Sequence, residues 1–165
     1  MSEPTKILGE ERRAFILSRL KESREPITGS ELASITNVSR QVIVGDITLL
    51  KAKNEPIIAT SQGYLYMNTN NPTSAERTLA FSHAPERTEE ELILLVDHGV
   101  TVKDVKIEHP VYGDLTASIM VSNRYEVKQF MEKIRNTNAA YLSELTDGIH
   151  LHTLTAPTEK VRVCR

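Results

Sequence analysis

The sequence has a single cysteine, Cys164, and it stands close to the end of the 165-residue chain. One cysteine cannot form an internal disulfide bond, and a metal site built from thiolates needs several of them. We therefore expect the fold to be held together by packing, and any metal to be held by other ligands.

Long apolar runs are also missing. No stretch approaches the roughly 18 residues of a membrane-spanning helix, and the first residues, Met1 to Pro4, lack the basic and apolar regions of a signal peptide. We also find no internal repeat, which excludes solenoid folds. We expect a cytoplasmic protein with no membrane partner.

A strong excess of charge of one sign is absent as well. The formal net charge is -2, and the content of 39% hydrophobic and 25% charged residues is ordinary for a soluble globular protein. The N-terminal part is only slightly more basic than the rest. Any nucleic-acid function has to be argued from residue pattern, because charge gives no support for it.

Residues 68–74 form a polar stretch, Asn-Thr-Asn-Asn-Pro-Thr-Ser, without apolar periodicity. We place a domain boundary there and predict two domains, 1–68 and 74–165. The overall fold class that we predict is α+β.

The first domain reads as three helices followed by a β-hairpin. We expect the helices at about 10–21, at about 28–35 and from 39 to about 53, and the hairpin strands at 57–60 and 64–67. Thr28 and Glu31 match a capping box, and Ser39 suits an N-cap. This order of elements is typical of a winged helix-turn-helix.

The third predicted helix has two different faces. Its apolar face carries Ile43, Ile47 and Leu50, and we expect Phe15, Ile16, Leu17 and Leu20 of the first helix to be buried as well. Its opposite face is short and polar, which lets a helix approach base edges closely. We predict that operator DNA is contacted by Ser39, Arg40, Gln41, Val44, Gly45, Thr48 and Lys51. Three helices and a hairpin also form protein-interaction modules, and this alternative stays open.

The second domain reads as strand, helix, strand, strand, helix, strand. We expect these elements at 79–81, 89–98, 102–108, 115–121, 125–135 and 148–154. This split β-α-β-β-α-β order favours one antiparallel sheet with both helices on one face, a sandwich-type domain.

His150 and His152 are two residues apart on the last predicted strand. Both rings should point to one face while Ile149 and Leu151 pack on the other. Two imidazoles form half of a site for a divalent transition metal of the nickel, zinc or iron type, and His83 and Glu91 are candidates to complete it. Two alternatives stay open: a polar sheet face, and a capping box between Thr88 and Glu91.

Three separated segments, 39–43, 108–113 and 148–153, together resemble the 3H-domain family of niacin-responsive bacterial repressors. The resemblance covers nearly the whole chain. It implies a homodimer that represses genes of NAD biosynthesis or niacin uptake, with nicotinic acid as the corepressor. It also implies a divalent metal bound by His83, Glu91, His150 and His152.

Nicotinate carries a pyridine nitrogen and a carboxylate at two separate positions of its ring. We hypothesise that the metal takes one group and that Arg87, His109 or Tyr112 meets the other. Two rival functions remain, a repressor whose effector is the metal itself and a metal-dependent enzyme fused to a winged helix. We predict that the protein is not an enzyme, because no convincing nucleophile or general base accompanies the histidines.

Overall fold

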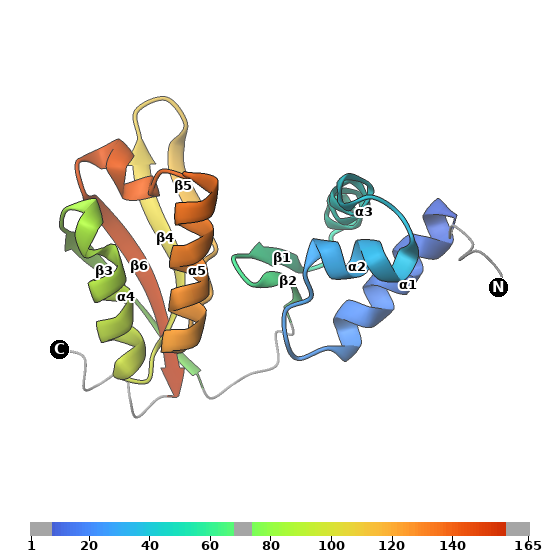
Figure 1. Ribbon diagram of the computed structural model, residues 1–165, viewed down its shortest axis with the longest axis horizontal. Coiled ribbons are helices and arrows are strands. Elements are labelled where there is room, and N and C mark those ends of the chain that lie inside the picture. The colour runs from blue at the N-terminus through green and yellow to red at the C-terminus, as the bar shows by residue number, and fades with distance from the viewer. Residues whose placement is uncertain (1–7, 68–73, 158–165) are drawn as a thin grey trace. The chain divides into compact units, whose positions relative to one another are not determined.

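The computed structural model describes residues 8–67 and 74–157, and the chain divides into two compact units, Met1–Asn70 and Asn71–Arg165 (Figure 1). The first residues, most of the polar stretch at 68–74 and Cys164 lie outside the described residues. No helix within those two described ranges is long and apolar enough to span a membrane. Each unit has its own buried apolar core.

The N-terminal unit has the predicted order of elements. Its helices are α1 (Gly9–Glu22), α2 (Gly29–Thr36) and α3 (Arg40–Ala52), followed by β1 (Ile57–Thr60) and β2 (Gly63–Tyr66), which pair antiparallel. The buried core contains Ile16, Leu20, Ile43, Ile47 and Leu50, as predicted. Phe15 and Leu17 were also predicted to be buried but are only half-buried, because they flank the buried stripe of α1.

Side-chain caps begin both α2 and α3. Thr28 Oγ1 accepts the backbone N–H of Glu31 at 3.1 Å, and Ser39 Oγ accepts that of Val42 at 3.3 Å. Between the two helices, Asn37 adopts the left-handed conformation with φ 54°, a common way to end a helix. These contacts produce the tight turn of a helix-turn-helix.

The hairpin is held against the helices through Ile27. Backbone hydrogen bonds of 3.0 and 2.8 Å join Ile27 and Tyr64 in both directions. Gly63 has φ +128°, and a Cβ there would lie 2.7 Å from the backbone of Ile27. Only glycine allows the wing to pass so close.

A buried ion pair ties α1 to α3. Asp46 accepts hydrogen bonds from Arg12 at 2.5 and 3.1 Å and from Arg13 at 3.3 Å, and both Arg12 and Asp46 are buried. The hydrogen bond to Asp46 raises the pKa of Arg12, although burial acts in the opposite direction. This ion pair on the buried side of α3 therefore helps to fix the orientation of the exposed side of the helix.

We expect Asp46→Ala to lower the free energy of unfolding by about 3 kcal/mol, because it removes the carboxylate from a buried guanidinium. Urea unfolding would measure the loss. The double variant Arg12→Met/Asp46→Leu should be less destabilised than Asp46→Ala, since it removes both buried charges together. If the double variant lost more free energy of unfolding than Asp46→Ala, the ion pair itself would be a net source of stability.

The C-terminal unit is a four-stranded sheet with the strand order β3-β6-β4-β5. The strands are β3 (Ser74–Ser82), β4 (Thr101–His109), β5 (Gly113–Ala117) and β6 (Ile149–Pro157), and the helices are α4 (Thr88–Asp97) and α5 (Arg124–Thr137). Every neighbouring pair is antiparallel, so β6 lies between the parallel strands β3 and β4. Both helices lie on the same side of the sheet (Figure 1), as predicted.

Several boundaries differ from the prediction. β3 begins five residues earlier than expected, and β6 continues to Pro157, because these two strands pair along their whole length. The strand predicted over 115–121 ends at Ala117, since the backbone turns at Met120 with φ 49° and Val121 makes only an isolated bridge to Val102. The short 3-10 helices η1 (Pro85–Arg87) and η2 (Leu142–Thr146) were not predicted.

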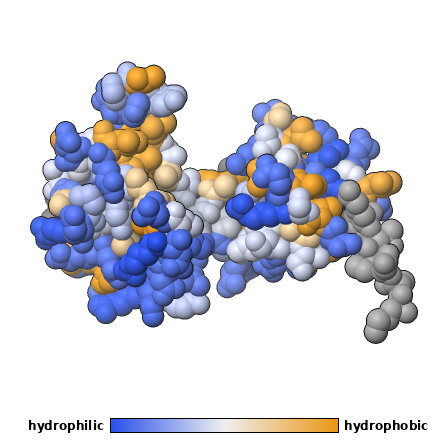
Figure 2. All heavy atoms as spheres, turned by 45° about the horizontal axis from the view of Figure 1, so that its top comes forward, coloured by the Kyte–Doolittle hydropathy of each residue, from blue (hydrophilic) through white to orange (hydrophobic). Residues whose placement is uncertain are grey.

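The sheet face opposite the helices is not covered by either helix. The expectation that Ile149 and Leu151 pack on that side is wrong for this chain, because their exposed fractions are 61% and 39%. The apolar core lies between the helices and the helix-facing side of the sheet, and it includes Leu92, Val96, Val102, Val121 and Val127. Figure 2 shows a mostly hydrophilic surface with a few hydrophobic patches.

Candidate metal and DNA-binding sites

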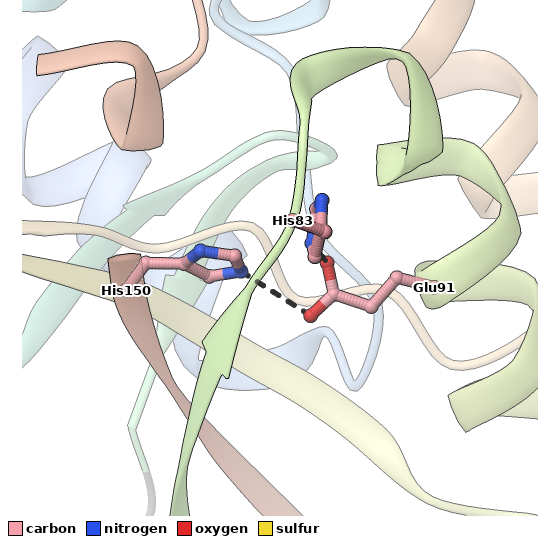
Figure 3. A group of neighbouring side chains, drawn as sticks. All are labelled: His83, Glu91 and His150. Atoms are coloured by element: carbon pink, nitrogen blue, oxygen red, sulfur yellow. Dashed lines mark hydrogen bonds and ion pairs between the residues drawn. The ribbon is translucent and has the colours of Figure 1, made fainter. Parts of the chain in front are cut away.

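The four predicted metal ligands lie together in the C-terminal unit. His83 follows β3, Glu91 lies in the first turn of α4, and His150 and His152 lie on β6. Figure 3 shows Glu91 reaching from its helix to the rings of His83 and His150. Its Oε2 contacts His83 Nε2, while Oε1 lies 3.2 Å from His150 Nε2 and 3.0 Å from His152 Nε2.

The other nitrogen of each ring is bonded to a backbone carbonyl. The Nδ1–H groups of His83, His150 and His152 donate to the carbonyl oxygens of Ala84, Gly148 and Asp104, at 2.8, 2.9 and 2.7 Å. A carbonyl only accepts, so the proton of each neutral ring is on Nδ1 and the lone pair is on Nε2. Histidines that bind metals in proteins are held in this way.

These tautomers make the cluster a good fit for a cation. Three Nε2 lone pairs face one carboxylate, and acceptors that face each other at about 3 Å repel unless a proton or a cation lies between them. His152 Nε2 is buried and makes no aligned hydrogen bond in the described part of the chain, despite its 3.0 Å contact.

Imidazole and carboxylate ligands suit nickel, zinc or iron. The ligand atoms of His83, Glu91 and His150 lie within 4.8 Å of one another, and His152 joins them through Glu91. A metal bound there would supply a positive charge, and a metal that takes more than four ligands would also keep an open coordination position.

Charges within the cluster shift two pKa values. Burial raises the pKa of Glu91, but the hydrogen bonds and charges of His150 and His152 outweigh it and hold that pKa well below its ordinary value. Burial lowers the pKa of His150, while Glu91 and the Gly148 carbonyl raise it more, so the net pKa is raised. Without metal the site therefore favours the ionised form of Glu91 and shifts His150 toward its protonated form.

The raised pKa of His150 predicts a pH effect on stability. Its contribution in the metal-free protein is complete below the unfolded pKa of about 6.5 and is lost as pH rises through the higher folded pKa. With a chelator present, the stability difference between wild type and His150→Gln should be larger at about pH 6 than at about pH 8.5. With metal the trend should reverse, because metal competes with protons. Urea unfolding at both pH values tests this, and equal differences would contradict it.

Gly148 and Asp104 support the cluster and were not predicted. Gly148 has φ +90°, and a Cβ there would overlap the carbonyl oxygen of His83, so glycine lets β6 begin against His83. Asp104 follows a bulge in β4, and its Oδ1 accepts the N–H of Thr153 at 3.0 Å. A glycine just before a strand was a visible signal for the first, whereas nothing in the sequence marks the bulge.

The alternative role of Glu91 as a capping partner of Thr88 is wrong. Arg87 is the N-cap of α4 and Thr88 is its first residue, with no side-chain cap. The Glu91 carboxylate is directed to the histidines instead.

The three predicted ligand-binding residues do not lie together. Arg87 pairs with Glu90 at 3.2 Å and lines a shallow pocket that also includes His83 and Glu91. His109 and Tyr112 lie at the turn between β4 and β5, where His109 Nδ1 accepts the N–H groups of Val111 and Tyr112. Their role in ligand binding stays a prediction, with Arg87 the one nearest the cluster.

The predicted DNA-contacting residues share the outer side of α3. Ser39, Arg40, Gln41, Gly45 and Thr48 are exposed, Lys51 is exposed too, and Val44 is half-buried. A Cβ on Gly45 would meet nothing within 4 Å. The exposed side of α3 therefore has no projecting side chain at Gly45, which suits a helix that enters the major groove.

The fold of the first unit and the cluster of the second define the class: a helix-turn-helix DNA-binding protein with a histidine-bearing α+β domain. The family described as 3H domain matches residues 76–162, and an HTH domain family matches residues 12–65. The chain belongs to the 3H-domain family of transcription repressors, which confirms the resemblance seen in the sequence.

Two relatives support this membership over almost the whole chain. The chain is 66% identical over 161 residues to "Transcription repressor NadR" of Bacillus subtilis, covering 96% of this chain and 89% of that protein. It is 40% identical over 155 residues to "Probable transcription repressor NiaR" of Thermotoga maritima, covering 94% and 87%. These relatives are regulators, in agreement with the prediction that the protein is not an enzyme.

Proposed function

We propose that the protein represses genes of NAD biosynthesis or niacin uptake, and that nicotinic acid is its corepressor, sensed at a divalent-metal site in the C-terminal unit. The metal is of the nickel, zinc or iron type, and His83, Glu91, His150 and His152 hold it. The protein works in the cytoplasm as a homodimer on double-stranded operator DNA.

The observation that carries the sensor part is the shared orientation of the three imidazoles. Each ring is bound to a carbonyl through Nδ1 and presents Nε2 to Glu91. A cation at the centre would account for this arrangement, whereas a polar sheet face does not require it. Nicotinate suits the open position of such a metal, because its carboxylate and its ring nitrogen are both good ligands.

The DNA-binding part rests on α3 and the residues at its start. Gln41 can pair with adenine, and Arg40 can reach guanine or phosphate. The Ser39 end of α3 presents backbone donors that favour a phosphate. In the proposed mechanism, corepressor binding favours the dimer in which two such helices fit half-sites one helical turn apart.

An operator-binding assay in which metal and nicotinate are varied independently tests the proposal. The operator is a duplex that the protein selects from a random library, and each measurement is made with chelator, metal alone, nicotinate alone, or both. We expect a change in operator affinity that needs both additions. A full response to metal alone would identify the metal as the effector, and loss of nicotinate during incubation would indicate an enzyme.

A further inference from the structure

A cavity of about 170 Å³ lies beside the histidine cluster, within the C-terminal unit. Glu91, His150 and His152 form its polar wall, so the cavity begins at the candidate metal ligands. Its other walls are mostly apolar and come from the sheet, both helices and η2, with contributions from Leu92, Ile119, Phe130, Ile134 and Tyr141.

The size of this cavity limits what can occupy it. An apolar protein cavity of about 150 Å³ binds benzene, whereas pockets for drug-sized molecules measure about 300–1,000 Å³. One planar six-membered ring with a small substituent therefore fits inside it. The mixture of apolar walls and one polar end suits an aromatic acid better than a sugar or an amino acid.

Thr88 contributes a polar group to this apolar cavity. It lines the cavity at the start of α4, and its Oγ1 is buried without a hydrogen-bond partner in the part of the chain that the structure describes. A buried hydroxyl without a partner is costly, so a bound molecule is expected to complete its hydrogen bonds.

The spacing of Thr88 and Glu91 matches the width of a single ring. Residues three apart on a helix share one face, with about 5–6 Å between their Cβ atoms. Thr88 and Glu91 both line the cavity, and the ring nitrogen and the carboxylate of nicotinate, in meta positions, are likewise separated by about the width of one ring. A ring in the cavity would thus meet the metal cluster on one side and the Thr88 hydroxyl on the other.

We propose that this cavity is the corepressor seat and that Thr88 determines its specificity. The ring packs against Phe130 and Ile134, one polar group of nicotinate faces the metal cluster, and the other accepts a hydrogen bond from Thr88 Oγ1. This inference rests on the function proposed above and replaces neither the metal ligands nor the DNA-binding helix.

Titration of the full-length, nickel-loaded protein with nicotinate tests the assignment. Thr88→Val keeps the shape of the side chain and removes the hydroxyl, so nicotinate should bind about tenfold more weakly, which corresponds to about 1.4 kcal/mol. Thr88→Ser should restore most of the affinity. Thr78→Val is the matched control, because Thr78 is exposed on β3 outside the cavity and its loss should have no effect.

A second variant tests the cavity without relying on one hydrogen bond. Ala117 lines the cavity from β5, and Ala117→Leu should fill part of it and block nicotinate while nickel affinity is unchanged. Wild-type affinity for nicotinate in both Thr88→Val and Ala117→Leu would overturn this inference. A wild-type protein that binds nickel but no nicotinate would instead overturn the proposed function.

Discussion

Glu91→Gln should weaken nickel or zinc binding by roughly 300-fold and remove the response of operator binding to nicotinate. Four-ligand zinc sites bind with about 10–16 kcal/mol, so one ligand accounts for roughly 3–4 kcal/mol. We expect a large loss of metal affinity from this one substitution because Glu91 contacts all three histidines. The uncharged amide can still donate to an Nε2 lone pair, so the metal-free fold should remain.

The adjacent carboxylate provides a matched control. Glu90 is exposed and pairs with Arg87, so Glu90→Gln removes the same charge one residue away without touching the cluster. Competition with a coloured chelator would measure metal affinity for both variants. Equal, small losses would show that Glu91 acts through general charge and is not a ligand.

Gly45→Glu should abolish specific operator binding, a loss of roughly 1000-fold, while the protein becomes no less stable. Glycine within a helix costs about 1 kcal/mol relative to alanine, and the space around Gly45 is open, so a side chain there is tolerated. At the DNA surface the same side chain would hold α3 away from the base edges and bring a negative charge to the phosphates. Such a loss reduces specific binding to the non-specific level.

Ala14→Glu separates this local effect from a change in net charge, because Ala14 is an exposed residue of α1 in the same unit. Operator affinity should fall far less in this variant than in Gly45→Glu. Thermal unfolding of both variants supplies the stability comparison. Normal operator binding by Gly45→Glu would mean that α3 does not enter the major groove as proposed.

The sequence predicted the elements of both units well because each has a strong local signal. The capping pattern at Ser39 predicts the start of α3, and the alternation of residues around His150 and His152 predicts β6. Local signals also explain the errors. Thr88 and Glu91 have the spacing of a capping box, but the three histidines compete for the same carboxylate and bind it, which no local pattern can reveal.

The cavity could not have been predicted from the sequence. Its walls come from α4, the sheet, α5 and η2, and the last of these is a five-residue 3-10 helix without apolar periodicity. Chemistry alone predicts His109 and Tyr112 as ligand residues, and the sequence could not show that they lie at the turn between β4 and β5. Which polar residues converge is decided by the pairing of β6 with both β3 and β4, a long-range property.

The Nδ1 atom of each of the three imidazoles is bonded to a main-chain carbonyl and not to another side chain. These anchors are backbone atoms, so replacing a neighbouring side chain removes none of them. Gly148 is the exception, because a Cβ there would overlap the carbonyl oxygen of His83. The arrangement of the candidate ligand atoms is then inherited with the backbone. During evolution, the cavity next to it is free to be re-lined for a different effector without rebuilding the cation site.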